Sequence, residues 1–101
     1  MAFINGPVPE VVERLVTATA TAFERDLRAA WPEVGRSVSG ALLLACDDLH
    51  LTIELEVLPQ RRLGLFELPQ LKVRYVFQGG DEAARRRWLA LLDRSMQKGG
   101  G

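Results

Sequence analysis

One short segment gathers the side chains that nucleophilic catalysis uses. Cys46, Asp47, Asp48 and His50 follow one another closely, and a thiol beside an imidazole and carboxylates supplies a nucleophile, a base and an orienting group. Side chains of an extended chain, however, alternate between two faces. The strand pattern described below points Cys46 inwards and His50 outwards, so the thiol and the imidazole cannot meet within hydrogen-bond reach. We therefore interpret Cys46 as a small core residue, His50 as a solvated residue and the two aspartates as a turn.

Composition excludes several other kinds of site. The chain has 101 residues with one cysteine and one histidine, which leaves no internal disulfide, no cysteine-rich zinc site and no two-histidine metal motif. Lys and Arg number 13, as do Asp and Glu, and this balance lacks the basic excess that is typical of nucleic-acid binders. No complete catalytic set, metal motif or cofactor loop can be assembled, so we expect a protein that is not an enzyme and carries no cofactor.

The sequence predicts neither a secretory leader nor a membrane span. Met1–Pro9 has no basic segment followed by an apolar run, and the longest wholly apolar run, Ala41–Cys46, is too short to cross a bilayer. We therefore expect a cytoplasmic protein without membrane or nucleic-acid partners. With 48% hydrophobic and 26% charged residues, the composition is typical of a single globular domain covering residues 1–101.

The first predicted element is a long helix from near Pro9 to Trp31. Proline suits the first helical position, and the proline that follows Trp31 ends the helix. Thr17–Ala22 alternates Thr with Ala and also fits a strand, but the longer three-to-four-residue period favours the helix. The apolar stripe comprises Val12, Leu15, Val16, Thr19, Ala22, Phe23, Leu27, Ala30 and Trp31.

Three runs of alternating residues predict an antiparallel meander, at Val38–Cys46, Leu49–Leu58 and Leu71–Gln78. If the second and third runs pair about Gly64, both acids of one run meet bases of the other, which favours this register by roughly 0.2–1 kcal/mol for each pair. The resulting outer-face pairs are Glu56 with Lys72, Glu54 with Arg74, Thr52 with Val76 and His50 with Gln78. Pairing about the aspartates sets Leu44 against Leu51, Cys46 against Leu49, Ala45 against His50 and Leu43 against Thr52.

The remaining segments complete an α+β fold. Pro59–Gln70 is expected to form an extended hairpin tip or an extra short strand near 63–68. Asp81 is a good N-cap for a last helix from about Glu82 to Lys98, and Gly99 is a good stop. The predicted order is α-β-β-β-α, an antiparallel three-stranded meander with both helices packed on one face, because only they can cover the apolar face.

The outer face of this sheet is unusually apolar, and we interpret it as an interaction surface. Contiguous exposed apolar area on a small domain marks a contact with another molecule, and an open meander also leaves an unpaired strand edge. The alternative is that Pro59–Gln70 folds back over this face. Otherwise we expect a protein-interaction or assembly module, forming a homodimer or binding another protein. The candidate interface residues are Ala41, Leu43, Ala45 and Val76, with Leu63, Leu65 and Phe66 of the tip.

A second interpretation is a binder of a small anion or a nucleotide-type ligand. Arg61 and Arg62 lie in the predicted tip, while Arg85 and Arg86 lie in the first turns of the last helix, whose free N–H groups attract anions. This interpretation requires the arginine-rich tip and the amino end of the helix to hold the ligand.

Overall fold

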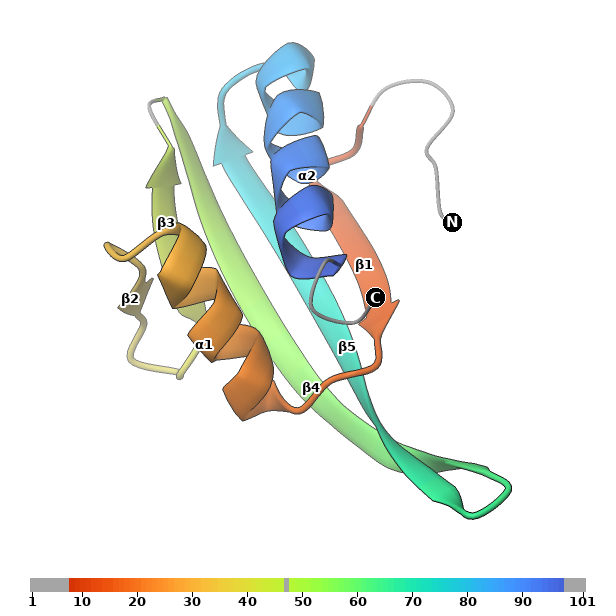
Figure 1. Ribbon diagram of the computed structural model, residues 1–101. Helices are drawn as coiled ribbons and strands as arrows, with labels where there is room; N and C mark the ends of the chain where they lie inside the picture. Colours follow the sequence, from red (N-terminus) through yellow and green to blue (C-terminus); the bar gives the residue numbers. More distant parts are fainter. Residues whose placement is uncertain (1–7, 47, 98–101) are drawn as a thin grey trace.

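Two helices pack on a five-stranded antiparallel sheet in the computed structural model, which describes residues 8–46 and 48–97 (Figure 1). The α+β class predicted from the sequence is confirmed. The strands lie in the order β1-β5-β4-β3-β2. In chain order the elements are β1 (Val11–Val16), α1 (Ala20–Ala30), β2 (Gly35–Arg36), β3 (Leu42–Cys46), β4 (Leu49–Leu63), β5 (Phe66–Gly79) and α2 (Glu82–Gln97).

The centre of the sheet has the register that the charges and the alternation predict. Glu54 pairs with Arg74 and Glu56 with Lys72 across β4 and β5. The predicted partners of Leu43, Leu44, Ala45 and Cys46 across β3 and β4 are likewise observed at the Cα level. Opposite charges and matched apolar residues therefore select this register together. Asp47 and the side chain of Cys46 lie outside the described residues, so the predicted aspartate turn and inward thiol are not described.

The prediction of one long helix from Pro9 to Trp31 is wrong in its first half. Val11–Val16 is an edge strand that pairs antiparallel with β5, with Val12 opposite Tyr75 and Val16 opposite Leu71. The helix begins only after Thr19, whose Oγ1 accepts a hydrogen bond from the Ala22 N–H at 3.0 Å. The apolar spacing misleads because the residues of a strand and of the following helix fall by chance on one helical period. The observed order is thus β-α-β-β-β-β-α, and the three predicted strands form the middle of a larger sheet.

The predicted connection Pro59–Gln70 is part of a long hairpin. β4 and β5 continue to Leu63 and Phe66, and Gly64 takes a left-handed conformation, with φ of 61°, in the turn between them. The register shifts between Leu58 and Arg61, so an extra residue on β4 bends the ribbon, as β-bulges do. The hairpin projects beyond the body of the sheet (Figure 1). Residues 63–68 therefore comprise the end of β4, the turn at Gly64 and Leu65, and the start of β5, and they do not form an additional strand.

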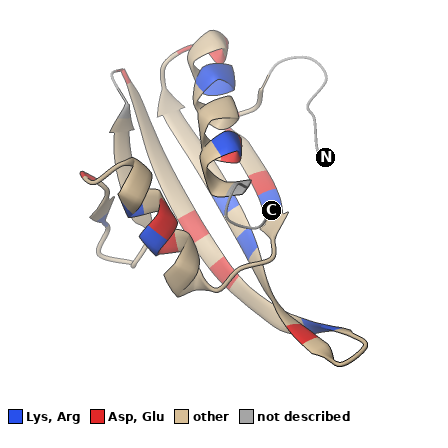
Figure 2. Cartoon of the chain, viewed as in Figure 1, with Lys and Arg blue, Asp and Glu red and all other residues tan. Residues whose placement is uncertain are grey.

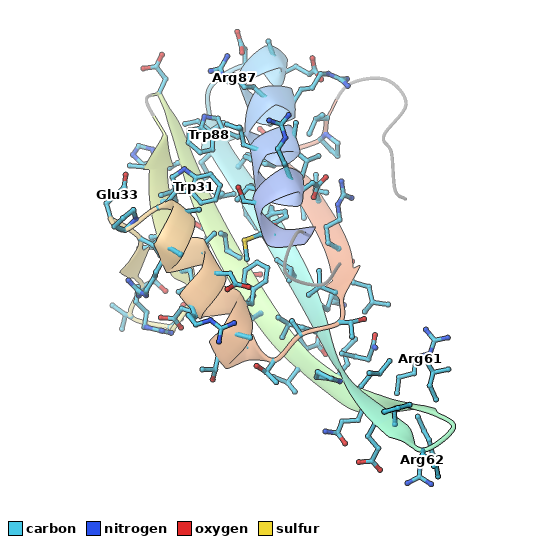
Figure 3. The ribbon with its side chains drawn as sticks, viewed as in Figure 1. Trp31, Glu33, Arg61, Arg62, Arg87 and Trp88 are labelled. Carbon is cyan, nitrogen blue, oxygen red and sulfur yellow. The ribbon has the colours of Figure 1, made fainter. Side chains whose placement is uncertain are left out.

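Both helices lie on one side of the sheet (Figure 1), and the core fills the space between the two layers. Trp31, which caps the end of α1, contacts Trp88 of α2 with ring centroids 5.8 Å apart (Figure 3). Asp81 accepts a hydrogen bond from the Ala84 N–H at 2.9 Å, which confirms the predicted N-cap. The buried core residues of the strands and helices are Val12, Phe23, Leu27, Leu42, Leu44, Leu49, Leu51, Ile53, Leu71, Val73, Tyr75, Phe77, Leu89 and Leu92.

Candidate functional site

The outer face of the sheet, opposite the helices, is open to solvent. Within residues 8–46 and 48–97 no helix or loop covers it (Figure 1). The alternative that Pro59–Gln70 folds back over this face is not what the structure shows, because that segment extends away as a hairpin. By strand alternation the outer face comprises Val11, Glu13 and Leu15 of β1, Lys72, Arg74, Val76 and Gln78 of β5, His50, Thr52, Glu54 and Glu56 of β4, and Leu43 and Ala45 of β3.

Charges on the outer face are sorted by strand. β5 supplies the bases Lys72 and Arg74, and β4 supplies the acids Glu54 and Glu56, as Figure 2 shows by blue and red positions side by side on the two strands. On the other side of β5, Glu13 of β1 is a third acid, with Oε2 4.0 Å from Lys72 Nζ. Arg74 Nη1 lies 3.3 Å from Glu54 Oε1, and Lys72 Nζ lies 3.5 Å from Glu56 Oε1. All four side chains remain about half exposed. The central face therefore presents a basic stripe beside an acidic stripe.

An apolar row crosses the sheet next to these charges. The register aligns Val11, Val76, Thr52 and Leu43 on four neighbouring strands. Val11 and Leu43 are exposed, and Val76 and Thr52 are half-buried. A shallow hollow of about 430 Å³ opens at the β3 end of this row, and its lining includes Leu43, Ala45, His50, Thr52 and Gln78. The row thus has an exposed valine at one end and a hollow at the other.

The predicted interface residues fall into two groups. Leu43 and Ala45 are exposed on the outer face, and Ala41 and Val76 are half-buried. Leu63, Leu65 and Phe66 surround the hairpin turn and are exposed, Leu65 completely at 101%. Val11 and Leu15 of β1 are also exposed apolar residues, and the sequence analysis missed them because it placed them in a helix. Val11–Val16 reads VVERLV, in which apolar and charged residues do not alternate, so the segment carries no two-residue period that could have revealed the strand.

The candidate anion-binding arginines are not brought together. Arg61 and Arg62 lie at the hairpin tip, while α2 begins at the opposite end of β5 (Figure 3). A strand as long as β5 spans roughly 45 Å. Each group also has local partners. Arg62 Nη2 bonds Glu67 Oε2 at 2.9 Å. Near the start of α2, Arg85 Nε donates to the Val8 carbonyl oxygen at 2.9 Å and Arg86 Nη2 lies 2.9 Å from Glu82 Oε2.

His50 is exposed on the outer face, opposite Ala45 and Gln78. Among the described residues no three His, Cys, Asp or Glu side chains gather closely enough to hold a metal ion. The same part of the chain contains no helix with the length and apolarity that a membrane crossing requires.

A cleft that the sequence analysis did not foresee opens on the helix side. It has a volume of about 510 Å³ and is bounded by the end of β1, the loop that leads into α1, the amino end of α1 and the carboxyl end of α2. Arg14 of β1 and Asp93 of α2 stand at its border as an ion pair, with Nη2 3.0 Å from Oδ2. Tyr75 of β5 also lines it. Burial, reinforced by the nearby Asp93 carboxylate, raises the pKa of Tyr75 far above its ordinary value, so the phenol is neutral.

Fold and surface together define a small α+β protein with one uncovered sheet face and one cleft between its helices. Comparison of the chain with protein-family models, with curated proteins and with solved structures gives no match in any of the three.

Proposed function

We propose that the protein is a non-catalytic assembly module that forms a symmetric homodimer by packing two outer sheet faces together. The observation that carries this proposal is the separation of charge, with bases on β5 and acids on the neighbouring β4. A symmetric dimer contact must be self-complementary, because the same patch meets itself. A face with an acidic and a basic stripe side by side meets that requirement.

A specific two-fold axis brings the stripes together. The axis lies in the contact plane, between β4 and β5, and runs along the strands. Rotation about it sets β5 of one copy on β4 of the other. Arg74 then faces Glu54 of the second copy, and Lys72 faces Glu56 of the second copy. Sheets that pack face to face lie about 10 Å apart, with their strands inclined by about 30°. A two-fold axis that bisects this angle still places the basic stripe of one copy over the acidic stripe of the other.

The same rotation pairs the apolar row with itself. Because β1 and β3 flank the central strands on opposite sides, Val11 of one copy lies over Leu43 of the other, and Val76 lies over Thr52. Val11 of the edge strand is exposed, and in this arrangement it lies against the hollow beside Leu43. Burial of this row supplies the favourable free energy of association, and the stripes set the register.

Matched charge-swap variants test the proposal. One variant carries Lys72→Glu with Arg74→Glu, and the other carries Glu54→Lys with Glu56→Lys. In each variant both stripes carry charge of the same sign, so two copies repel each other. Sedimentation should therefore show that each variant is a monomer, whereas the parent is a dimer. Mixed in equal amounts, the two variants should form a heterodimer. Circular dichroism should show both to be folded, because each cross-strand pair contributes only about 0.2–1 kcal/mol.

A second pair of substitutions tests whether the apolar row of the outer face makes the contact. Leu43→Glu places a charge in the apolar row and should abolish the dimer, whereas Val38→Ser replaces an exposed apolar residue in the loop between β2 and β3 and should leave it intact. A parent protein that stays monomeric at high concentration would overturn the proposal. So would a dimer that survives Leu43→Glu, since association would then use the edge of β1 or the hairpin tip.

A further inference from the structure

The cleft between the helices contains a buried polar group that lacks a partner. Tyr75 is 2% exposed, and its hydroxyl makes no hydrogen bond to any described residue. Every fully sealed side-chain nitrogen or oxygen of the described residues does have a partner. The Tyr75 hydroxyl is therefore not sealed in the core, and it reaches the cleft that Tyr75 lines. A buried hydroxyl without a partner costs free energy unless water or a ligand satisfies it.

The walls of the cleft combine apolar side chains with polar and charged ones and carry no net charge. Two arginines and two aspartates line it, and they pair with each other as Arg14 with Asp93 and Arg25 with Asp26. No lining charge is therefore left to select a charged ligand. The apolar lining comprises Leu15, Val16, Ala18, Ala22, Phe23, Pro69 and Met96. A volume of about 510 Å³ falls within the range of small-molecule sites, which are mostly apolar with a few polar groups that fix orientation.

We propose that this cleft binds a neutral, largely apolar small molecule that bears one carbonyl-type oxygen, which accepts a hydrogen bond from the Tyr75 hydroxyl. The neutral phenol is a donor, so the matching group is an acceptor. The Arg14–Asp93 pair holds β1 and α2 at the border of the cleft, and each charged side chain of the lining has a partner of opposite sign. This site lies on the helix side of the sheet, and of its lining residues only Leu15, on the edge strand β1, was also assigned to the outer face.

Binding of Prodan, a neutral naphthalene ketone whose emission reports polarity and hydrogen bonding, tests the proposal. The parent protein should bind one Prodan per chain and enhance its fluorescence. Tyr75→Phe removes only the hydroxyl, so it should weaken binding about five- to tenfold, the usual effect of one lost hydrogen bond. It should also shift the bound emission to shorter wavelength, because the ketone loses its donor.

Two alanines of α1 allow one substitution that fills the cleft and a matched control that does not. Ala22 lines the cleft, whereas Ala29 is exposed and lies outside its lining. Ala22→Trp should reduce Prodan affinity at least tenfold, and Ala29→Trp should leave it unchanged, with circular dichroism to show that both variants fold. Absence of Prodan binding to the parent overturns the proposal. Equal binding by the parent, Tyr75→Phe and Ala22→Trp also overturns it, because the dye would then occupy the open sheet face or the hairpin tip.

Discussion

Arg14 of β1 and Asp93 of α2 form a two-point ion pair across the border of the cleft. The guanidinium Nε and Nη2 donate to the two carboxylate oxygens at 3.2 and 3.0 Å. The side chains are 14% and 26% exposed, so both are largely withdrawn from water. Because the pair joins the first strand to the last helix, it ties together segments that lie far apart in the sequence.

We expect removal of one partner of this pair to destabilise the fold measurably. Arg14→Ala leaves the half-buried Asp93 carboxylate without its two donors, which should lower the free energy of unfolding by about 1–3 kcal/mol. Arg14→Lys should recover only part of the loss, because an ammonium group cannot reproduce the two parallel hydrogen bonds. Urea denaturation at low protein concentration measures both effects without a contribution from association.

The exposed pair Arg25–Asp26 serves as the control. Its arginine is 74% exposed, so Arg25→Ala should change stability by less than about 0.5 kcal/mol. A double-mutant cycle over Arg14 and Asp93 should give a clear coupling energy. If Arg14→Ala and Arg25→Ala cost the same, the ion pair does not hold β1 against α2.

The hairpin tip should be dispensable for folding although it is rich in apolar residues. Leu65 and Phe66 are both exposed, so Leu65→Ser and Phe66→Ser should each change the free energy of unfolding by less than about 0.5 kcal/mol. Leu92→Ala, in the core, should cost about 2–5 kcal/mol. The measurement is again urea denaturation at low concentration. A large loss from either tip variant would mean that the hairpin packs against the body.

Local information specified the centre of the sheet, and this explains why its register could be predicted. Glu54, Glu56, Lys72 and Arg74 lie on two strands joined by one turn, so charge and alternation point to a single alignment. β1 is different, because a six-residue edge strand is stabilised mainly by its pairing with β5, at the other end of the chain. Tertiary pairing of this kind overrides local helical periodicity.

The same error hid the cleft and the part of the outer face that β1 contributes. With Arg14 assigned to a helix, nothing connected it with Asp93, and with Val11 in that helix the apolar row ended at Val76. The outer-face residues of β3 and β5 could be predicted because these two strands were themselves predicted from the sequence. Alternation along the predicted run Leu71–Gln78 places Tyr75 on the core face, opposite to Arg74 and Val76. Its unpartnered hydroxyl depends on how α1 and α2 are placed, which alternation along a strand does not specify.

Gly79 should be the least replaceable glycine of the described turns. Its φ is 79°, and a Cβ at this position would lie 2.5 Å from the backbone oxygen of Asp48. Gly79→Ala combines this clash with left-handed strain and should cost about 1–3 kcal/mol. Gly64 also has a positive φ but faces open space, so Gly64→Ala should cost only about 1 kcal/mol. Equal losses in thermal denaturation would show that the contact with Asp48 relaxes freely.

Two carboxylates should make the fold less stable in acid. Hydrogen bonds from Arg36 and then Arg28 hold the pKa of Glu24 below its ordinary value of 4.5. The Val8 N–H, which donates to Glu82 at 2.8 Å, and the charge of Arg86 do the same for the pKa of Glu82. A carboxyl group whose pKa is lower in the folded state stabilises the fold above its unfolded pKa, and this contribution is lost as the pH falls through the folded value. Stability should therefore decline below about pH 4.5.

Glu24→Gln isolates one of these contributions, because glutamine resembles the protonated side chain. Near pH 7 the substitution should lower the free energy of unfolding by about 0.5–1 kcal/mol, since Glu24 binds both Arg28 and Arg36. As the pH falls through the lowered pKa of Glu24, the parent carboxylate becomes protonated and the stabilities of the two proteins should converge. Urea denaturation across this pH range measures the difference. If the difference stays constant with pH, the substitution acts through packing on α1, and the ion pairs of Glu24 do not account for the acid sensitivity.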